Sequence, residues 1–225
     1  METEPKERIA VIGGTGKEGR GLGFRWSRAG FPVIIGSRQA EKAVTFANEL
    51  SELVGPGAHI EGYENARAAL EADVVVVTVP YTAHADILAG IREAVQGKLV
   101  VDVTVPMEAG HITRVYVPPD GSAALEAKRI LGDGVKLASA FQNVPYSRLL
   151  NEEEIDCDVL VCGIDKETRD RVISLAAAAG LRAWDAGPLE NSVVPEGLTS
   201  ILLGINRRFH IEGAGIRITG VGSGQ

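Results

Sequence analysis

The chain has 225 residues, of which 45% are hydrophobic and 24% are charged, and these proportions are ordinary for a globular protein with a sizeable core. The formal net charge is −7, and neither a basic tail nor a basic stripe is visible, which argues against general binding of nucleic acid or of membrane surfaces. Positive groups that meet an anionic ligand must therefore be local.

The cysteines and the N-terminus indicate the compartment. Two cysteines, Cys157 and Cys162, are too few for a disulfide framework, and we interpret both as small core residues rather than metal ligands. The first residues, METEPKER, lack the apolar stretch of a signal peptide, and no apolar run approaches the ~20 residues of a membrane span. We expect a cytoplasmic protein without a metal site.

Short apolar runs alternate with longer segments in which apolar residues recur at three- and four-residue spacing. The run DVVVVTV, from Asp73, is typical of a strand that is covered on both faces of a parallel sheet. This alternation predicts an α/β fold, a Rossmann-type doubly wound parallel sheet, over residues 1–150. The expected strands are 9–12, 32–35, 59–62, 74–79, 99–103 and 136–140, and the expected helices include 19–29 and 40–53.

Residues 151–225 continue the pattern on a smaller scale. They predict a small C-terminal α/β unit with strands at 158–162 and 181–185, a helix at 166–179 and a last helix at about 196–210. This unit is too short for us to expect that it folds independently.

The stretch RIAVIGGTGKEGRG joins the first expected strand to the first helix and contains G-x-G-x-x-G at Gly14, Gly16 and Gly19. In a dinucleotide-binding loop the first glycine permits the sharp turn, the second lets a pyrophosphate approach the main chain, and the third lets the helix pack close to the strand. The pyrophosphate then meets free N–H groups at the positive end of the helix. A plain strand-to-helix turn would explain one of these glycines, not three in register.

The end of the second strand indicates which dinucleotide binds. An NAD-binding unit has an acidic residue here for the ribose 2′-hydroxyl. This chain instead has Gly36, Ser37 and Arg38, with Lys42 four residues beyond. A guanidinium fork and a hydroxyl suit a 2′-phosphate, so we predict NADP(H).

No acid–base set for a carbonyl reductase is visible in the sequence. None of the four tyrosines is followed by a lysine four positions later, and the four histidines form no metal-ligand cluster. His84, just beyond a strand end, is the histidine best placed to face a cofactor. We therefore predict no catalytic side chain and a redox partner that accepts a hydride directly, because such a transfer needs positioning more than proton transfer.

The sequence resembles the coenzyme F420-dependent NADP oxidoreductases, also called NADPH-dependent F420 reductases. The likeness rests on IAVIGGTGKEGRGLGFRWSRAGFPVIIGSR, VTVPYTAH, VVDVTVP and DAGPLENS, in this order, and covers nearly the whole chain. It implies a reversible hydride transfer between NADP(H) and the deazaflavin F420, with the nicotinamide face to face with the deazaflavin. It also implies a homodimer whose C-terminal unit helps to close the site, with Arg207 and Arg208 available to the anionic F420 tail.

The resemblance further implies a set of cofactor contacts in four groups: the phosphate loop, the 2′-phosphate site, the ends of the fourth and fifth strands, and a segment near the nicotinamide and the deazaflavin. Tyr81 stands where the family often has tryptophan, and AFQNVPY lacks a histidine that some relatives have. In the order of the four groups, the implied contacts are Gly14, Thr15, Gly16, Lys17, Glu18 and Gly19; Ser37, Arg38 and Lys42; Pro80, Tyr81, His84 and Val105; and Phe141, Asn143, Pro145 and Tyr146.

Two alternative functions stay open on the sequence. An NADP-dependent imine or carbonyl reductase would share the N-terminal domain, although about 75 residues after it leave little room for the long helical domain of such enzymes. A protein that senses NADP(H) without turnover would equally lack acid–base residues. Reduction of F420 by NADPH would separate both from the first hypothesis.

Overall fold

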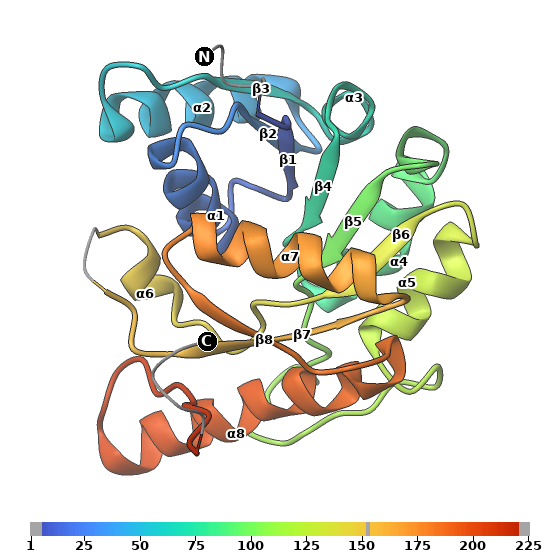
Figure 1. The fold of residues 1–225 in the computed structure, drawn as a ribbon, viewed down its shortest axis with the longest axis vertical. Helices are drawn as coiled ribbons and strands as arrows, with labels where there is room; N and C mark the ends of the chain where they lie inside the picture. The colour runs from blue at the N-terminus through green and yellow to red at the C-terminus, as the bar shows by residue number, and fades with distance from the viewer. Residues whose placement is uncertain (1–5, 152–153, 221–225) are drawn as a thin grey trace.

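The structure is a computed structural model and describes residues 6–151 and 154–220. Within these residues eight strands form one sheet in the order β3-β2-β1-β4-β5-β6-β7-β8 (Figure 1). The first six strands are parallel, and their order is that of a Rossmann domain, so the predicted fold class is confirmed. The strands are β1 (Ile9–Ile12), β2 (Val33–Ser37), β3 (Ile60–Glu64), β4 (Val74–Val77), β5 (Leu99–Asp102), β6 (Lys136–Ser139), β7 (Asp158–Gly163) and β8 (Arg182–Asp185).

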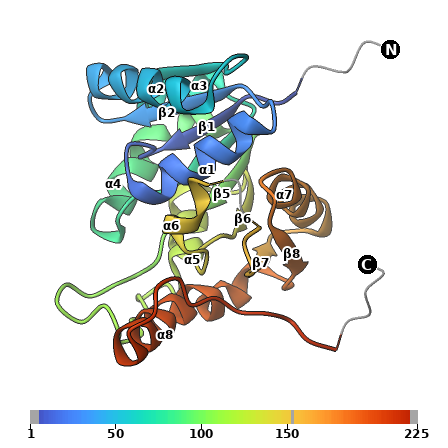
Figure 2. The same ribbon diagram turned by 90° about the vertical axis from the view of Figure 1, so that its left-hand side faces the viewer.

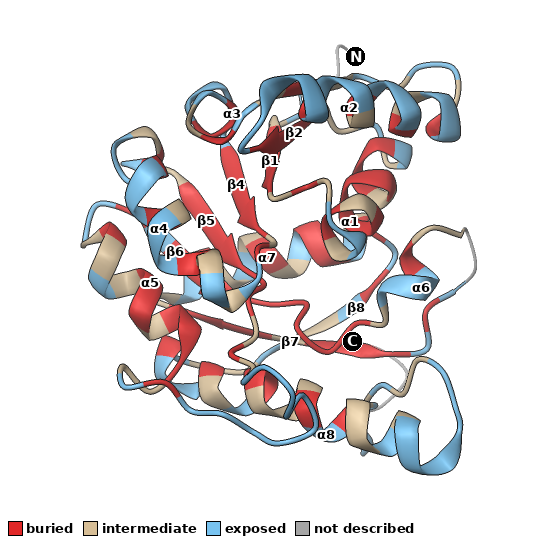
Figure 3. Cartoon of the chain, turned by 180° about the vertical axis from the view of Figure 1, so that it is seen from behind, coloured by how far each residue is buried: buried red, intermediate tan, exposed pale blue. Residues whose placement is uncertain are grey.

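Helices cover both faces of the parallel strands, as the continuously apolar β4 predicts. One core cluster lies between the sheet and α1, α2 and α7, and a second lies between the sheet and α3, α4 and α5. Figure 3 shows the strands buried between these layers. The helices are α1 (Lys17–Arg28), α2 (Ala40–Val54), α3 (Asn65–Glu71), α4 (Tyr81–Ile91), α5 (Ala123–Leu131), α6 (Tyr146–Leu149), α7 (Lys166–Ala178) and α8 (Val193–Phe209), with short 3₁₀ turns η1 (Glu93–Val95) and η2 (Leu189–Ser192).

The C-terminal segment extends the sheet instead of forming a second one. β7 runs antiparallel to β6, with Cys162 opposite Ser139, and β8 is parallel to β7. Both Cys157 and Cys162 are buried and unpaired, as expected for core residues. Helix α8 then crosses below the carboxyl ends of β4 and β5 (Figures 1 and 2). The last part of the chain is thereby brought to the edge of the sheet at which ligands bind in such folds.

Local sequence explains the start of several helices. Ser122 accepts a hydrogen bond from Leu125 N at the start of α5, and Asp165 accepts one from Thr168 N at the start of α7, as N-cap residues do. Helix α8 begins at Val193, three residues before the predicted start, because proline is tolerated in the first turn of a helix. No helix in the part of the chain that the structure describes is long and apolar enough to cross a membrane.

Candidate active site

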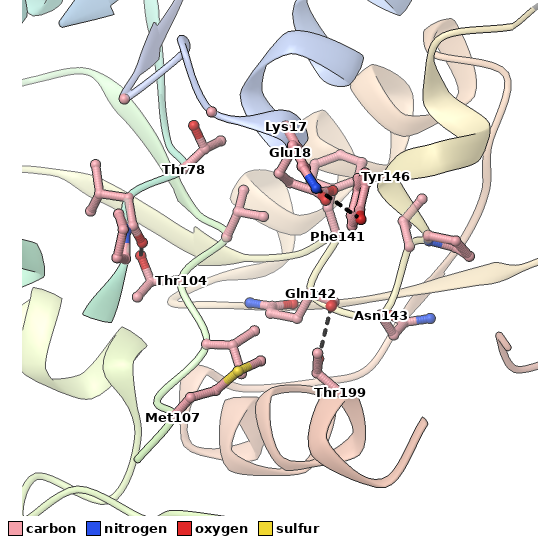
Figure 4. A pocket seen from close by; sticks show the side chains of 18 of the residues that line it. Lys17, Glu18, Thr78, Thr104, Met107, Phe141, Gln142, Asn143, Tyr146 and Thr199 are labelled. Carbon is pink, nitrogen blue, oxygen red and sulfur yellow. Dashed lines mark hydrogen bonds between the residues drawn. The ribbon is translucent and has the colours of Figure 1, made fainter. Parts of the chain in front are cut away.

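A cavity of about 1130 Å³ lies at the carboxyl ends of the parallel strands, on the side that faces α8 (Figure 4). Loops after β1, β2, β4, β5 and β6 form one wall, and residues of α8 with the segment 211–214 form the other. Ligands of open α/β sheets bind in this crevice. Most of the predicted site residues line it: Thr15, Gly16, Lys17, Glu18, Ser37, Arg38, Lys42, Pro80, Val105, Phe141, Asn143, Pro145 and Tyr146.

The turn after β1 uses its glycines in a slightly different way from the prediction. Gly13, not Gly14, has the left-handed conformation, with a φ of 74°, that glycine adopts without strain. Gly14 is required by proximity, since a Cβ atom there would lie 2.7 Å from the carbonyl oxygen of Val11. The sharp turn therefore begins one residue earlier than the motif predicts.

Gly19 packs closely against the sheet, as the motif predicts, and the backbone at Gly16 is left open. A Cβ atom at Gly19 would lie 2.6 Å from Thr78 Oγ1, so helix α1 can approach the sheet only without a side chain there. At Gly16 the nearest atom would be a carbonyl oxygen 3.4 Å away, and the backbone is open toward the cavity. No side chain caps the N-terminus of α1, which leaves its first N–H groups available to an anion.

Positive charge lies at two places along this wall. Lys17 Nζ is 3.3 Å from the hydroxyl oxygen of Tyr146 and 4.9 Å from the centre of its ring. Arg38 and Lys42 line the cavity beyond β2, and neither forms an ion pair within residues 6–151 and 154–220. With the hydroxyl of Ser37 they offer an anion two uncommitted cations and a hydrogen bond.

The loop after β6 is held in a strained conformation. Phe141 has a φ of 73°, a value that costs a residue with a side chain energy and that concentrates at functional sites. Its ring is buried and packs edge-on against Trp26, with ring centres 5.9 Å apart. The turn places the two following side chains, Gln142 and Asn143, in the cavity wall (Figure 4).

Gln142 and Asn143 present unpaired acceptors in this wall. Their amide nitrogens are committed, since Gln142 Nε2 donates to the Asp102 carbonyl at 3.0 Å and Asn143 Nδ2 donates to the Asp158 carbonyl at 2.8 Å. Gln142 Oε1 and Asn143 Oδ1 are buried without a partner among the described residues. A buried unpaired acceptor is costly, and a ligand in the cavity could reach these two oxygens only if the loop shifted.

His84 does not line the cavity, in contrast to the expectation from sequence. Its side chain is fully buried, with Nε2 2.8 Å from Asp102 Oδ2 and Nδ1 3.0 Å from Glu126 Oε1. Burial by itself lowers the pKa of His84, but the Asp102 charge and the hydrogen bonds from Asp102 and Glu126 outweigh it and raise the pKa to about 9. His84 is therefore an imidazolium between two carboxylates at neutral pH.

Tyr81 was also expected to contact the cofactor, but it does not line the cavity, because it too is bound to Glu126 of α5. Its hydroxyl donates to Glu126 Oε2 at 2.8 Å, and its ring lies beside His84, with centres 6.0 Å apart. The neighbours Pro80 and Thr82 line the cavity, whereas Tyr81 is turned toward α5. The first turn of α4 thus uses its aromatic residue and its histidine to hold α5.

Glu18, beside the phosphate loop, has no hydrogen-bond partner among residues 6–151 and 154–220. Its Oε1 is buried and unpaired, and burial raises its pKa to about 8. Between pH 4.5 and about 8 the unfolded chain ionises this group while the folded chain keeps it neutral, so the group's contribution to stability falls as pH rises through this window.

Glu18→Gln should therefore gain thermal stability relative to the unsubstituted protein as pH rises toward about 8, and the difference should level off above that pH. Thermal melts of both proteins across this range measure the effect. Glu52→Gln, at an exposed position on α2, is the matched control and should show no such divergence. If the melting temperatures of Glu18→Gln and the unsubstituted protein differ by the same amount at every pH in this range, the raised pKa of Glu18 is contradicted.

The resemblance implied that the C-terminal unit helps to close the site, but the sequence did not indicate which residues of α8 form the wall. Thr199, Leu202 and Asn206 line the cavity on successive turns of that helix, and Thr199 Oγ1 donates to the Gln142 carbonyl at 2.8 Å. Arg207 and Arg208, in contrast, are exposed and do not line the cavity. The regular spacing of Thr199, Leu202 and Asn206 was visible, but nothing in it distinguished a cavity wall from an ordinary helix face.

The parallel sheet, the glycine loop at an uncapped helix and the cations beyond β2 define a dinucleotide-binding oxidoreductase of the Rossmann type. Residues 8–106 match the family model described as NADP oxidoreductase, coenzyme F420-dependent. The chain is 42% identical to the F420-dependent NADP reductase of Methanothermobacter marburgensis over 94% of this chain and 98% of that one. The corresponding enzyme of Methanocaldococcus jannaschii is 41% identical over the same shares. The chain belongs to the F420-dependent NADP oxidoreductase family.

Solved structures agree on the fold. A candidate F420-dependent NADP reductase from Arthrobacter sp. FB24 superposes with a TM-score of 0.76 at 22% identity, covering 95% of this chain and 99% of that one. A Plasmodium falciparum pyrroline carboxylate reductase with NADP bound gives a TM-score of 0.55 at 11% identity, with 81% of this chain and 59% of that chain covered. The Rossmann arrangement is thus shared with enzymes of several activities, and the site must distinguish among them.

Proposed function

We propose that this protein transfers a hydride reversibly between NADP(H) and the deazaflavin coenzyme F420. The observation that carries the proposal is the cavity itself, which has phosphate-binding features at one end and a second wall from α8 and residues 211–214 at the other. Its volume of about 1130 Å³ exceeds that of an ordinary small-molecule pocket, as a site for two cofactors requires.

The residues present fit NADP(H). The diphosphate would bind the N–H groups in the first turn of α1, because those of Gly14 and Gly16 already donate to backbone carbonyls, and the 2′-phosphate would bind Ser37, Arg38 and Lys42. The loop that carries Gln142 and Asn143 would pack beside the nicotinamide ring.

NADPH supplies the hydride when it is bound, and F420 accepts it. The chain's own contribution is positioning: the loop after β1 and the tip of β2 anchor one cofactor, while α8 and residues 211–214 close over the other. Reduction of F420 by NADPH consumes one proton, which solvent would supply, and no histidine of the described residues lines the cavity. We therefore assign no catalytic side chain.

The direct test is to mix the protein with NADPH and oxidised F420 and to follow the loss of the deazaflavin absorbance. We expect turnover with NADPH and much slower turnover with NADH. A control without F420, in which NADPH is offered simple keto and imine compounds, should show no oxidation. Absence of F420 reduction, or turnover of a keto or imine compound instead, would overturn the proposal.

We also propose a homodimer formed through α8. Val194, Ile201, Ile205 and Phe209 project from that helix with 63%, 50%, 36% and 64% of their surfaces exposed. Val115, in a loop that packs against Gly197 of α8, adds to the same apolar patch. Such a patch marks an interaction site, and the implied family dimer supplies its partner, a second copy of the chain.

Ile201→Glu should convert the dimer into a monomer, because a charge at the centre of an apolar interface is left without a partner. Sedimentation equilibrium measures the mass. Leu53→Glu, at an equally exposed leucine of α2 far from α8, is the matched control and should remain dimeric. A monomeric unsubstituted protein at micromolar concentration would contradict the dimer.

Both proposed substrates are small and diffusible, and we propose a cytoplasmic location for the enzyme.

A further inference from the structure

The chain beyond α8 returns to the cavity as a short segment, residues 211–218, which we call the C-terminal strap. Its first part, 211–214, lines the cavity. Ala214 N donates to Asn206 Oδ1 at 2.9 Å, and a Cβ atom at Gly213 would lie 3.2 Å from Pro145 Cβ. The strap therefore connects the end of α8 with the loop that follows β6 (Figure 2).

One buried carboxylate anchors the far end of the strap. Asp158, the first residue of β7, has only 1% of its surface exposed. Its Oδ2 accepts a hydrogen bond from Ile218 N at 2.7 Å and another from Trp184 Nε1 at 2.8 Å. Its Oδ1 accepts one from Arg182 Nε at 2.7 Å, and its backbone N donates to the Ile216 carbonyl at 2.8 Å.

These hydrogen bonds stabilise the charged form of Asp158. Burial by itself would raise the pKa of Asp158, but the donors Ile218, Trp184 and Arg182 together lower it. Hydrogen bonds to an ionised acceptor are roughly twice as strong as neutral ones. The strap is thus tied to β7 by a charge-assisted bond, not by apolar packing alone.

Asp158 also contacts the opposite side of the cavity wall. Its carbonyl accepts the hydrogen bond from Asn143 Nδ2, which leaves Asn143 Oδ1 unpaired beside the cavity. At Gly215 the strap lies directly on the adjacent Cys157, since a Cβ atom there would come within 2.7 Å of Cys157 Sγ. At Asp158 the cavity wall that contains Asn143 meets the wall formed by the strap.

We propose that Asp158 is a positioning residue for the second substrate: by anchoring residues 216–218 it holds residues 211–214 as the wall against which the deazaflavin binds. The inference rests on the proposed function, which places F420 at this end of the cavity. The contacts expected for the phosphates of NADP(H), at the loop after β1 and at the tip of β2, do not involve the strap. Release of the strap should therefore weaken the binding of F420 and leave the binding of NADPH unchanged.

Asp158→Asn tests the proposal, because it keeps the shape of the side chain and removes the charge. An asparagine has a single acceptor oxygen, so the amide leaves either Arg182 Nε or both Ile218 N and Trp184 Nε1 without an acceptor, and a bond to Ile218 that remains is no longer charge-assisted. We expect the KM for F420 to rise about tenfold, as for the loss of one charge-assisted hydrogen bond, while kcat and the Kd for NADPH stay within about twofold. Hydrogen exchange at the amide of Ile218 should become faster.

Two further variants separate anchoring from general damage. Trp184→Phe removes the other donor to Oδ2 but leaves the bond to Ile218, so it should not change the KM for F420. Gly215→Ala displaces the strap from Cys157 with the Asp158 carboxylate intact and should reproduce the rise in KM. This variant keeps the test decisive even if Asp158→Asn does not fold.

An unchanged KM for F420 in folded Asp158→Asn and in Gly215→Ala would overturn the assignment, as would an equal rise in the Kd for NADPH. Failure of the proposed function has a different signature: the unsubstituted protein would then not reduce F420 at all. In that case faster exchange at Ile218 would still show the anchor, but the role toward the second substrate would be refuted.

Discussion

Replacing His84 with alanine should lower the free energy of unfolding by about 3–5 kcal/mol, because it leaves two buried carboxylates without their shared cation. Asp102 and Glu126 lie 2.8 and 3.0 Å from the two ring nitrogens, and the imidazole is fully buried. Urea denaturation at neutral pH measures the loss. Turnover below the unfolding transition should persist, since His84 does not reach the cavity.

The pH dependence of this effect has a defined sign. The folded pKa of His84 is raised to about 9 from an ordinary value of 6.5, so the stabilisation is fully present below pH 6.5 and is lost as pH rises through about 9. The difference between the unsubstituted protein and His84→Ala should therefore shrink across that window. His111→Ala is the control, since His111 is half exposed, and its effect should stay within about 0.5 kcal/mol.

A small change in stability, together with a loss of turnover by several orders of magnitude, would contradict this assignment. It would show that His84 takes part in proton transfer during the reaction. The two readouts are independent, because one is measured by denaturation without cofactors and the other by the F420 assay.

The parallel sheet could be predicted because its signal is local. β1, β2, β4 and β5 are short, fully buried runs such as Val74–Val77, and they alternate with helical patterns. The glycine loop was equally visible, since its spacing reflects contacts within a few residues. Even there the left-handed residue proved to be Gly13, because the motif constrains which residues lack side chains more than it constrains each φ angle.

The rest of the site depends on contacts between distant parts of the chain. His84 was placed correctly just beyond a strand end, but its partners lie 18 and 42 residues away, and they turn the ring from the cavity. The acceptor at Gln142 depends on the strained turn at Phe141 and on the Asp102 carbonyl. The strap reaches the cavity through contacts with residues far upstream, among them the hydrogen bond from Ile218 N to Asp158 Oδ2. No periodicity in the sequence encodes such pairings.

The antiparallel pairing of β6 with β7 could likewise not be predicted from local sequence. The sequence predicted a small α/β unit after residue 150, and the strands and helix of that unit are present. Its sheet is continuous with that of the first unit, because Ala138 and Ser139 pair with Gly163 and Cys162. Strand direction depends on how the chain returns to the sheet, and the apolar pattern of a strand does not record it.

Arg38→Ala should weaken NADPH binding by about 10- to 100-fold, as expected for the loss of a charge-assisted contact with the 2′-phosphate, and should change NADH binding by less than about twofold. Arg38 lies beyond the tip of β2, lines the cavity and forms no ion pair within residues 6–151 and 154–220, so its removal leaves no buried charge behind. Fluorescence titration with each coenzyme gives the two dissociation constants.

Lys42→Ala should show the same selectivity with a smaller effect, because an ammonium group is a point charge and lacks the planar fork of a guanidinium. Arg171→Ala, at a surface arginine of α7 that pairs with Glu7, removes the same charge from a distant face and should affect neither coenzyme. The ratio of the two constants is the decisive quantity. If Arg38→Ala weakens NADPH and NADH equally, the side chain supports the fold of the β2 tip rather than binding the 2′-phosphate. The preference for NADP(H) would then have to come from another part of the cavity.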